Sequence, residues 1–139
     1  MSEKYKTIGR RAWAAYDACD VEAFAACVTP DWREHNGDGP VDTLDSMRAL
    51  IDAQRRAFPD KHTEIVQELV EGDLLAQRTI TVATHTGRYF DLEPTGRTVR
   101  LHEINIHRMV GARIAETWIA VSAPGGFYKQ LSGRDAPSD

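Results

Sequence analysis

Apolar residues recur at helical spacing through the first part of the chain. Ile8 and Tyr16 lie on one face of the first predicted helix. Either Asp42 or Thr43 is suited to be the N-cap of the third predicted helix. The segment 29–41 is rich in Pro, Asp and Gly, which predicts a loop. The predicted helices cover Lys4–Ala18, Val21–Val28 and a segment from residue 42 or 43 to Phe58, which Pro59 limits.

The second part of the chain is rich in Val, Ile, Thr and Leu, which is typical of strands. Turn residues separate these runs at Gly72-Asp73, at 93–96 and at Val110-Gly111. Helices followed by consecutive antiparallel strands predict an α+β fold, here as one domain over residues 1–139. The predicted strands are His62–Glu71, Leu74–Thr86, Thr98–Met109 and Arg113–Val121, followed by a short helix over Gly126–Leu131 and a loose tail over 132–139.

The third of these strands departs from simple alternation. Its apolar residues have odd numbers before residue 102, whereas Ile104 and Ile106 have even numbers. Either a β-bulge lies at the change, or the strand is apolar on both faces and presents polar groups to a pocket. In the second case Glu103, Asn105 and His107 share one face and suggest a site. A solvated sheet face remains the alternative.

Composition and charge argue against several partners. The 139 residues include 17 Lys and Arg and 21 Asp and Glu, and the formal net charge is −4. No basic run is longer than Arg55-Arg56, so nucleic acid is not expected as a partner. No apolar stretch approaches the roughly 20 residues that span a bilayer, and residues 1–10 lack the apolar core of a signal peptide. We therefore expect a cytoplasmic protein with no membrane partner.

Cys19 and Cys27 are the only cysteines in the chain. Their spacing along a continuous helix would separate them by about 12 Å, which exceeds the Cα separation of about 7 Å that a disulfide allows. We expect buried structural thiols, as in a reducing compartment.

Several segments resemble one known family when they are taken in order. The segments His85–Phe90 and Glu93–Val99 together resemble a hairpin of the SnoaL-like polyketide cyclases. The motif of that hairpin is H-x-G-x-[aromatic] followed by P-T-G-[RK]-x-[V]. Arg113–Trp118 is similar to the G-K-I-x-E-x-W strand of that family, and Lys129–Leu131 with Gly133 is similar to its closing Q-L-G. The likeness extends over nearly the whole chain.

This resemblance implies a cone of the kind found in nuclear-transport-factor-type and ketosteroid-isomerase-like proteins. In it, three N-terminal helices pack on a strongly curved antiparallel sheet around an apolar ligand cavity. The resemblance also implies a homodimer, a small apolar or aromatic substrate, and neither a cofactor nor a metal. The superfamily includes isomerases, epoxide hydrolases, hydroxylases and binding proteins without chemistry, so the fold alone does not set the function.

The resemblance carries over to the site only in part. The cyclases place an acid/base aspartate where this chain has Ile119. The positions aligned with Glu103 and Asn105 are Gln and His in the family, and Tyr16 lies close to a pocket tyrosine. The side chains expected to bind substrate are Trp13, Tyr16, Phe58, Tyr89, Phe90, Trp118 and Ile119.

Glu103 is the carboxylate available to replace the missing aspartate. Enclosure would raise its pKa toward neutrality and make it a useful base, with Asn105 or His107 donating to the developing oxyanion. His35 is a further acid/base candidate on its loop. A cross-strand ion pair between Glu103 and an arginine is the structural alternative. The histidines and Glu103 show no metal-binding spacing.

The sequence thus predicts a small cofactor-independent enzyme acting on a polyketide-like or other apolar carbonyl compound. Aldol cyclisation, isomerisation and hydroxylation or hydration all remain open. A non-catalytic binding or accessory protein on the same fold is the alternative, and epoxide hydrolysis is a third.

Overall fold

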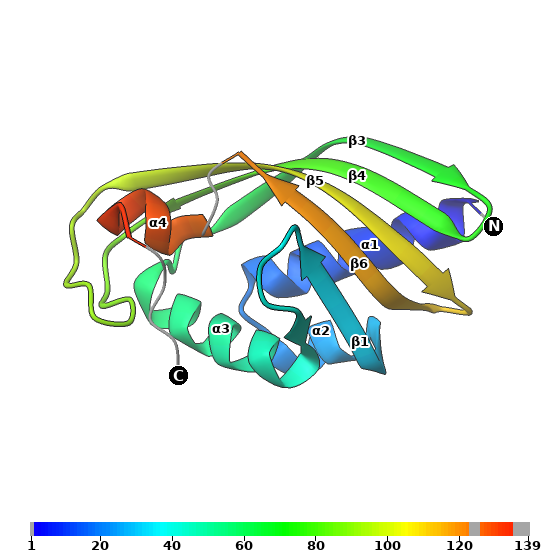
Figure 1. Cartoon of the computed structure of the whole chain (residues 1–139), viewed down its shortest axis with the longest axis horizontal. Coiled ribbons are helices and arrows are strands. Elements are labelled where there is room, and N and C mark those ends of the chain that lie inside the picture. Colours follow the sequence, from blue (N-terminus) through cyan, green and yellow to red (C-terminus); the bar gives the residue numbers. More distant parts are fainter. Residues whose placement is uncertain (1, 123–125, 135–139) are drawn as a thin grey trace.

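The computed structural model describes residues 2–122 and 126–134. The elements in chain order are α1 (Ser2–Asp17), α2 (Val21–Ala25), β1 (Val28–Asn36), β2 (Asp42–Thr43), α3 (Leu44–Ala57), β3 (His62–Glu71), β4 (Leu74–Thr84), β5 (Thr98–Val110), β6 (Arg113–Val121) and α4 (Gly126–Ser132). The long strands curve over the three N-terminal helices (Figure 1). The predicted α+β class is therefore confirmed.

Six strands form one unclosed sheet in the order β2-β1-β6-β5-β4-β3. Neighbouring strands are antiparallel, except that β1 and β6 run parallel. Helix α1 packs against β3 and β4. We call the helix-covered side, which carries Leu75, Gln77 and Thr79 of β4, the inner face of the sheet, and the opposite side the outer face.

Strand β5 alternates without interruption, which decides between the two interpretations of its sequence. Its pairing with β4 is continuous from Thr98 to Arg108, so no bulge lies near residue 102. Asn105 and His107 are buried on the inner face, whereas Ile104 and Ile106 are exposed on the outer face. The apolar residues change parity because both faces of this strand carry apolar groups.

Residues 28–36 form strand β1, and the prediction of a loop over 29–41 was wrong for this part. The strand pairs with β6 through Glu34, His35 and Asn36, which lie opposite residues 117–119. Its register shifts between Val28 and Arg33, where the sequence has Pro30. Proline lacks the amide N–H that a regular ladder needs, so it is tolerated at such an irregularity.

Most other predicted boundaries agree with the structure to within a few residues. Thr43 is the N-cap of α3, where its hydroxyl and that of Ser46 form a reciprocal capping box. The second helix ends at Ala25 instead of Val28. Both cysteines are free and buried. Of the predicted tail, Ser132 belongs to α4, and residues 135–139 lie outside the described residues.

Within the part of the chain that the structure describes, the apolar core consists of two clusters. The first joins α1, α2 and α3 to the inner face through residues such as Ile8, Trp32 and Ile51. The second surrounds Phe58 and includes Tyr128 of α4. Side chains from both clusters contribute to the wall of one cavity.

Candidate active site

A cavity of about 250 Å³ lies between the helices and the inner face of the sheet. Most of its wall is aromatic or aliphatic, and none of its described lining residues is Lys or Arg. The polar side chains that line it are Tyr16, Glu34, Asn36, Asp42, Gln54, Tyr89, Glu103, Asn105, His107 and Thr117. Acidic and neutral polar groups are thus set into an apolar wall.

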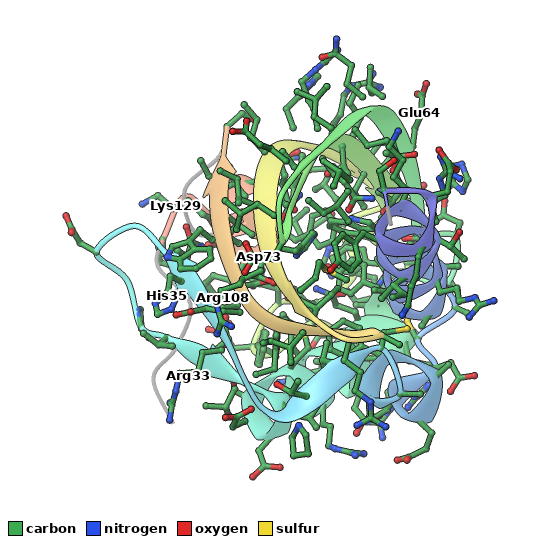
Figure 2. All side chains as sticks on the ribbon, turned by 90° about the vertical axis from the view of Figure 1, so that its right-hand side faces the viewer. Arg33, His35, Glu64, Asp73, Arg108 and Lys129 are labelled. Carbon is green, nitrogen blue, oxygen red and sulfur yellow. The ribbon has the colours of Figure 1, made fainter. Side chains whose placement is uncertain are left out.

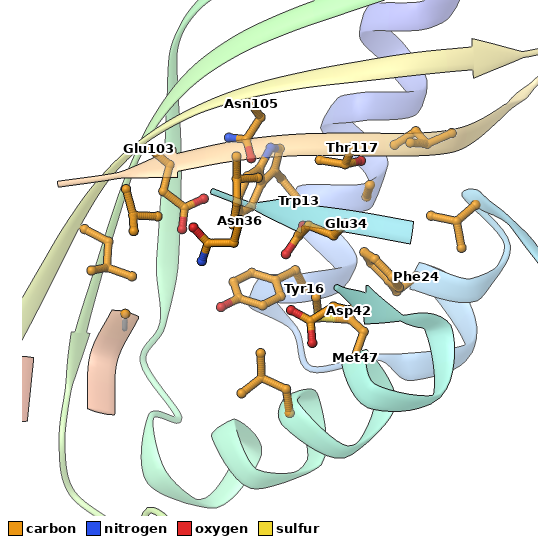
Figure 3. Close-up of a pocket in the computed structure, with 18 of the residues that line it drawn as sticks. Trp13, Tyr16, Phe24, Glu34, Asn36, Asp42, Met47, Glu103, Asn105 and Thr117 are labelled. Carbon is orange, nitrogen blue, oxygen red and sulfur yellow. The ribbon is translucent and has the colours of Figure 1, made fainter. Parts of the chain in front are cut away.

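Strand β5 contributes Glu103, Asn105 and His107 to this wall. They are two residues apart on a regular strand, so all three side chains project from the inner face. Figure 3 shows the Glu103 carboxyl group directed into the same space as the side chains of Glu34 and Tyr16. The structure therefore brings the three predicted polar residues of β5 together at one cavity.

Glu103 is half-buried, and the accessible part of its side chain faces the cavity. Burial raises the pKa of Glu103 to about 7, and the neighbouring amide of Asn105 opposes part of the rise. Its cross-strand neighbours are Thr79 and Val121, so no arginine stands opposite it. A carboxyl group with a pKa near the working pH can both take and release a proton.

Glu34 is a second cavity carboxyl, and sequence reasoning missed it. It lies opposite Thr117 on one side and Asp42 on the other. Burial raises the pKa of Glu34 to about 8, with the charges of Glu103 and Asp42 adding to the rise. The signal was the alternation of Trp32, Glu34 and Asn36, which all line the cavity. The proline and glycine content of this segment concealed it.

Two phenols and an amide form another part of the wall. Burial raises the pKa of Tyr16 above its usual range, and the Glu103 and Tyr89 charges add to this. Burial also raises the pKa of Tyr89 to about 12, while the amide of Gln54 opposes part of both rises. Behind them, Lys61 donates from Nζ to Gln54 Oε1 at 2.7 Å and lies 3.5 Å from the centre of the Tyr16 ring. Gln54 occupies a buried position of α3, and a polar residue on the apolar face of a predicted helix could have indicated a cavity-lining residue from the sequence.

Trp13, Tyr16, Tyr89 and Ile119 also line the cavity, as expected for substrate-binding residues. His35 and Trp118 do not, because they alternate with Glu34 and Ile119 and therefore face outward. His35 Nε2 lies 2.6 Å from Glu116 Oε2, and its ring stacks on Trp118 with centroids 5.6 Å apart. Figure 2 shows His35 beside Arg108, which also donates to Glu116. His35 therefore lies outside the cavity lining, where its ring contacts Glu116 and Trp118.

Phe58 and Phe90 were expected at the substrate and also lie outside the cavity lining. Phe58 is fully buried in the second core cluster, where its ring packs between Tyr89 and Phe127. Phe90 has a positive φ of 53° and is 42% exposed, because it lies in a tight turn after Tyr89. Phe58 is therefore a core residue, and Phe90 is a surface residue.

Each helix within residues 2–122 and 126–134 is too short or too polar to serve as a membrane span.

Comparison with known proteins gives the relatives of this fold. Among solved structures, AclR of Streptomyces galilaeus, a proposed hydroxylase, is 27% identical with a TM-score of 0.80, over 99% of this chain and 87% of that chain. IdmH of Streptomyces antibioticus, a proposed polyketide cyclase, is 22% identical with a TM-score of 0.71, over 84% and 91%. TsrD of Streptomyces laurentii is 21% identical with a TM-score of 0.77, over 95% and 97%. No curated protein matches the chain.

A family model identifies the group to which these likenesses point. The model described as SnoaL-like polyketide cyclase matches residues 6–124, which include every helix and strand named above except α4 and the first residues of α1. The family match supports a cyclase-type function, and the solved structures support the fold. The chain belongs to the SnoaL-like polyketide cyclase family.

Proposed function

We propose that this protein is a small enzyme acting on a polyketide-like or other apolar carbonyl compound, with Glu103 as the base. The observation that carries the proposal is the Glu103 carboxyl group, whose pKa burial raises to about 7 in a cavity otherwise rich in apolar groups. A carboxylate with this pKa removes a proton next to a carbonyl far better than an ordinary one, because its conjugate acid is weaker.

An aldol cyclisation illustrates the chemistry. The Glu103 carboxylate takes a proton from the carbon beside a carbonyl, and the electron pair of the C–H bond becomes an enolate. The enolate carbon then bonds to a second carbonyl carbon of the same molecule, whose oxygen takes up a proton. The product is an isomer of the substrate. Asn105 and His107, on the same strand face, are the N–H groups available to stabilise the enolate oxygen.

Glu34 is suited to return the proton. With a pKa of about 8, its carboxyl group is mostly protonated near neutral pH, whereas Glu103 is then partly ionised. Two carboxyls with different pKa values in one cavity can divide the roles of acid and base. We assign the acid role to Glu34 as part of the same proposal.

Turnover of candidate substrates tests the proposal. Linear and partly cyclised polyketide intermediates would be incubated with the protein, and products would be followed by chromatography and mass spectrometry. Glu103→Gln should lower turnover at least about 100-fold. The matched control is Glu64→Gln, since Glu64 is exposed on the outer face of β3 (Figure 2). Near-normal turnover by Glu103→Gln contradicts the assignment.

A binding or accessory protein without chemistry is the second candidate. It is favoured by Ile119, which lines the cavity at the position where the resemblance places an acid/base aspartate. Tight binding of the same compounds with no turnover by the unmodified protein would select this candidate.

A further inference from the structure

Three buried polar side chains form a hydrogen-bonded chain within the cavity wall. Trp32 Nε1 donates to Thr117 Oγ1 at 3.0 Å, and Thr117 Oγ1 lies 2.8 Å from His107 Nδ1. The three residues come from β1, β6 and β5, and each is at most 6% exposed. All three line the cavity, where Figure 3 shows the position of Thr117.

This chain decides which nitrogen of His107 carries the proton. The Trp32 indole is only a donor, so it occupies one lone pair of Thr117 Oγ1, and the hydroxyl proton needs an acceptor of its own. Among the described residues, His107 Nδ1 is the acceptor within hydrogen-bond distance of that hydroxyl. Thr117 therefore donates to Nδ1, and the proton of the imidazole is on Nε2.

Counting unpaired groups gives the same answer. In the Nε2–H tautomer, Nε2–H is the one group of the Trp32, Thr117 and His107 side chains that has no protein partner among the described residues. In the other tautomer two buried groups are left unpaired, the Thr117 hydroxyl proton and a bare Nε2. Each buried polar group without a partner is unfavourable, so the first tautomer is preferred.

The protonated imidazole is disfavoured for the same reason. It would have to donate from Nδ1 to Thr117 and would again leave the hydroxyl proton unpaired. Burial lowers the pKa of His107 to about 4, although the carboxyl groups of Glu34 and Glu103 line the same cavity. His107 is thus a neutral hydrogen-bond donor near neutral pH.

Two buried donor nitrogens therefore belong to residues of the cavity wall and make no hydrogen bond within the protein. His107 Nε2 is one, and Asn105 Nδ2 is the other among the described residues, although the Asn105 amide also acts on the neighbouring Glu103 carboxyl group. They are two residues apart on one strand face, which separates their Cα atoms by about 7 Å. A ligand that pairs with them must offer oxygen acceptors. Because Glu34, Asp42 and Glu103 line the cavity and no described lining residue is Lys or Arg, an uncharged oxygen is favoured over a carboxylate.

The structure assigns to Thr117, whose hydroxyl oxygen accepts from the Trp32 indole, the role of a positioning residue that holds His107 in the Nε2–H tautomer, so that Nε2–H donates to a carbonyl oxygen of the ligand. The tautomer is independent of the proposed function. The assignment of a carbonyl ligand, which we call the ligand half, rests on that function. When Glu103 removes a proton from the substrate, the carbonyl oxygen becomes the enolate oxygen and would still accept from His107 Nε2–H.

Nitrogen NMR of the imidazole tests the tautomer without any substrate. Protein labelled with ¹⁵N-histidine would be examined by long-range proton–nitrogen correlation, which separates the two neutral tautomers and the charged ring. The unmodified protein and Thr117→Ser, which keeps the hydroxyl, should both show Nε2–H at neutral pH. Thr117→Val should give a mixture of tautomers.

Thr117→Ala provides a second perturbation if Thr117→Val does not fold. It also removes the hydroxyl that donates to Nδ1, so a mixture of tautomers is again expected. An Nδ1–H or charged ring in the unmodified protein overturns the inference. So does an unchanged tautomer in a folded variant that lacks the hydroxyl.

A matched pair of probes tests the ligand half. 1-Tetralone and tetralin share a bicyclic skeleton and differ in one carbonyl oxygen. The unmodified protein should bind the ketone more tightly, and His107→Phe should lower the affinity for the ketone about tenfold while leaving tetralin unchanged. Equal affinity for the two probes, no measurable binding of the ketone, or an unchanged preference in His107→Phe overturns this half.

The design separates this inference from the proposed function. Glu103→Gln should keep both the tautomer and the preference for the ketone, because Gln is uncharged like the protonated glutamate and lies outside the Trp32–Thr117–His107 chain. If Glu103→Gln retains full turnover, the proposed base is wrong, whereas the NMR result still stands.

Discussion

Replacing Glu103 by Gln should make the protein more stable at alkaline pH. The substitution keeps the size of the side chain and removes its charge. The folded pKa of Glu103 is about 7, above its ordinary value of 4.5. Between these values the folded protein holds a proton that the unfolded chain has lost, so the free energy of unfolding falls as pH rises through this range and then levels off.

The size of the effect follows from the two pKa values. The difference between 4.5 and about 7 corresponds to about 3 kcal/mol, at about 1.4 kcal/mol for each pKa unit. Glu103→Gln should therefore exceed the unmodified protein by up to about 3 kcal/mol at about pH 8.5, and the two should be nearly equal at about pH 4. Such a gain in stability is expected because a charge that function requires in a cavity often lowers the stability of the folded protein.

Urea unfolding followed by tryptophan fluorescence measures this difference. The midpoint and slope would be compared at both pH values for the unmodified protein, Glu103→Gln and the exposed control Glu64→Gln. The control should match the unmodified protein at both values. If Glu103→Gln is no more stable than the unmodified protein at alkaline pH, the carboxylate is well solvated, and the argument from burial is refuted.

Further predictions concern catalysis, packing and assembly. The kcat/KM profile should rise through about pH 7 as Glu103 ionises and fall through about pH 8 as Glu34 does, and Glu34→Gln should lower kcat/KM at every pH and abolish the alkaline fall; a profile that stays flat contradicts both roles. Gly87→Ala should lower the free energy of unfolding by at least about 2 kcal/mol in a melting experiment, because a Cβ there would clash with the Arg56 carbonyl oxygen; an unchanged melting temperature would contradict the packing. The homodimer implied by the family resemblance stays a prediction: if it forms through the outer face, where Ile106 is 40% exposed, Ile106→Glu should convert a dimer to a monomer in light scattering, and a monomeric unmodified protein would contradict it.

The order of elements could be predicted because most of them carry a local signal. Thr43 is a good N-cap, and Pro59 follows directly on the C-cap of α3. Strand β1 could not be predicted, because its structure depends on parallel pairing with β6, which lies far along the chain. Local composition around Pro30 indicated a loop, and the long-range pairing overrides it.

The site could be predicted where strand alternation was regular. Glu103, Asn105 and His107 were grouped by parity alone, and the structure places them at one cavity. The same rule separates Trp118 from Ile119, since adjacent strand residues face opposite sides. Treating both as substrate-binding residues overlooked that constraint.

Contacts between distant segments lay beyond the sequence. The carboxyl group of Glu34 meets the cavity only because β1 pairs with β6. The Trp32–Thr117–His107 chain likewise joins three strands and leaves no pattern along any one of them. A polar residue at a position where the sequence pattern predicts core, such as Gln54 on α3, is the feature from which such a site could have been predicted.

Direct titration of Glu103 tests the central claim, that the cavity holds this carboxyl group ready for proton transfer near neutral pH. The side-chain carboxyl carbon would be followed by ¹³C NMR across the pH range, with Glu103→Gln identifying the resonance. A midpoint of about 7 is expected, because burial disfavours the carboxylate. A midpoint near the ordinary value of 4.5 would contradict the claim and leave the protein without its proposed base.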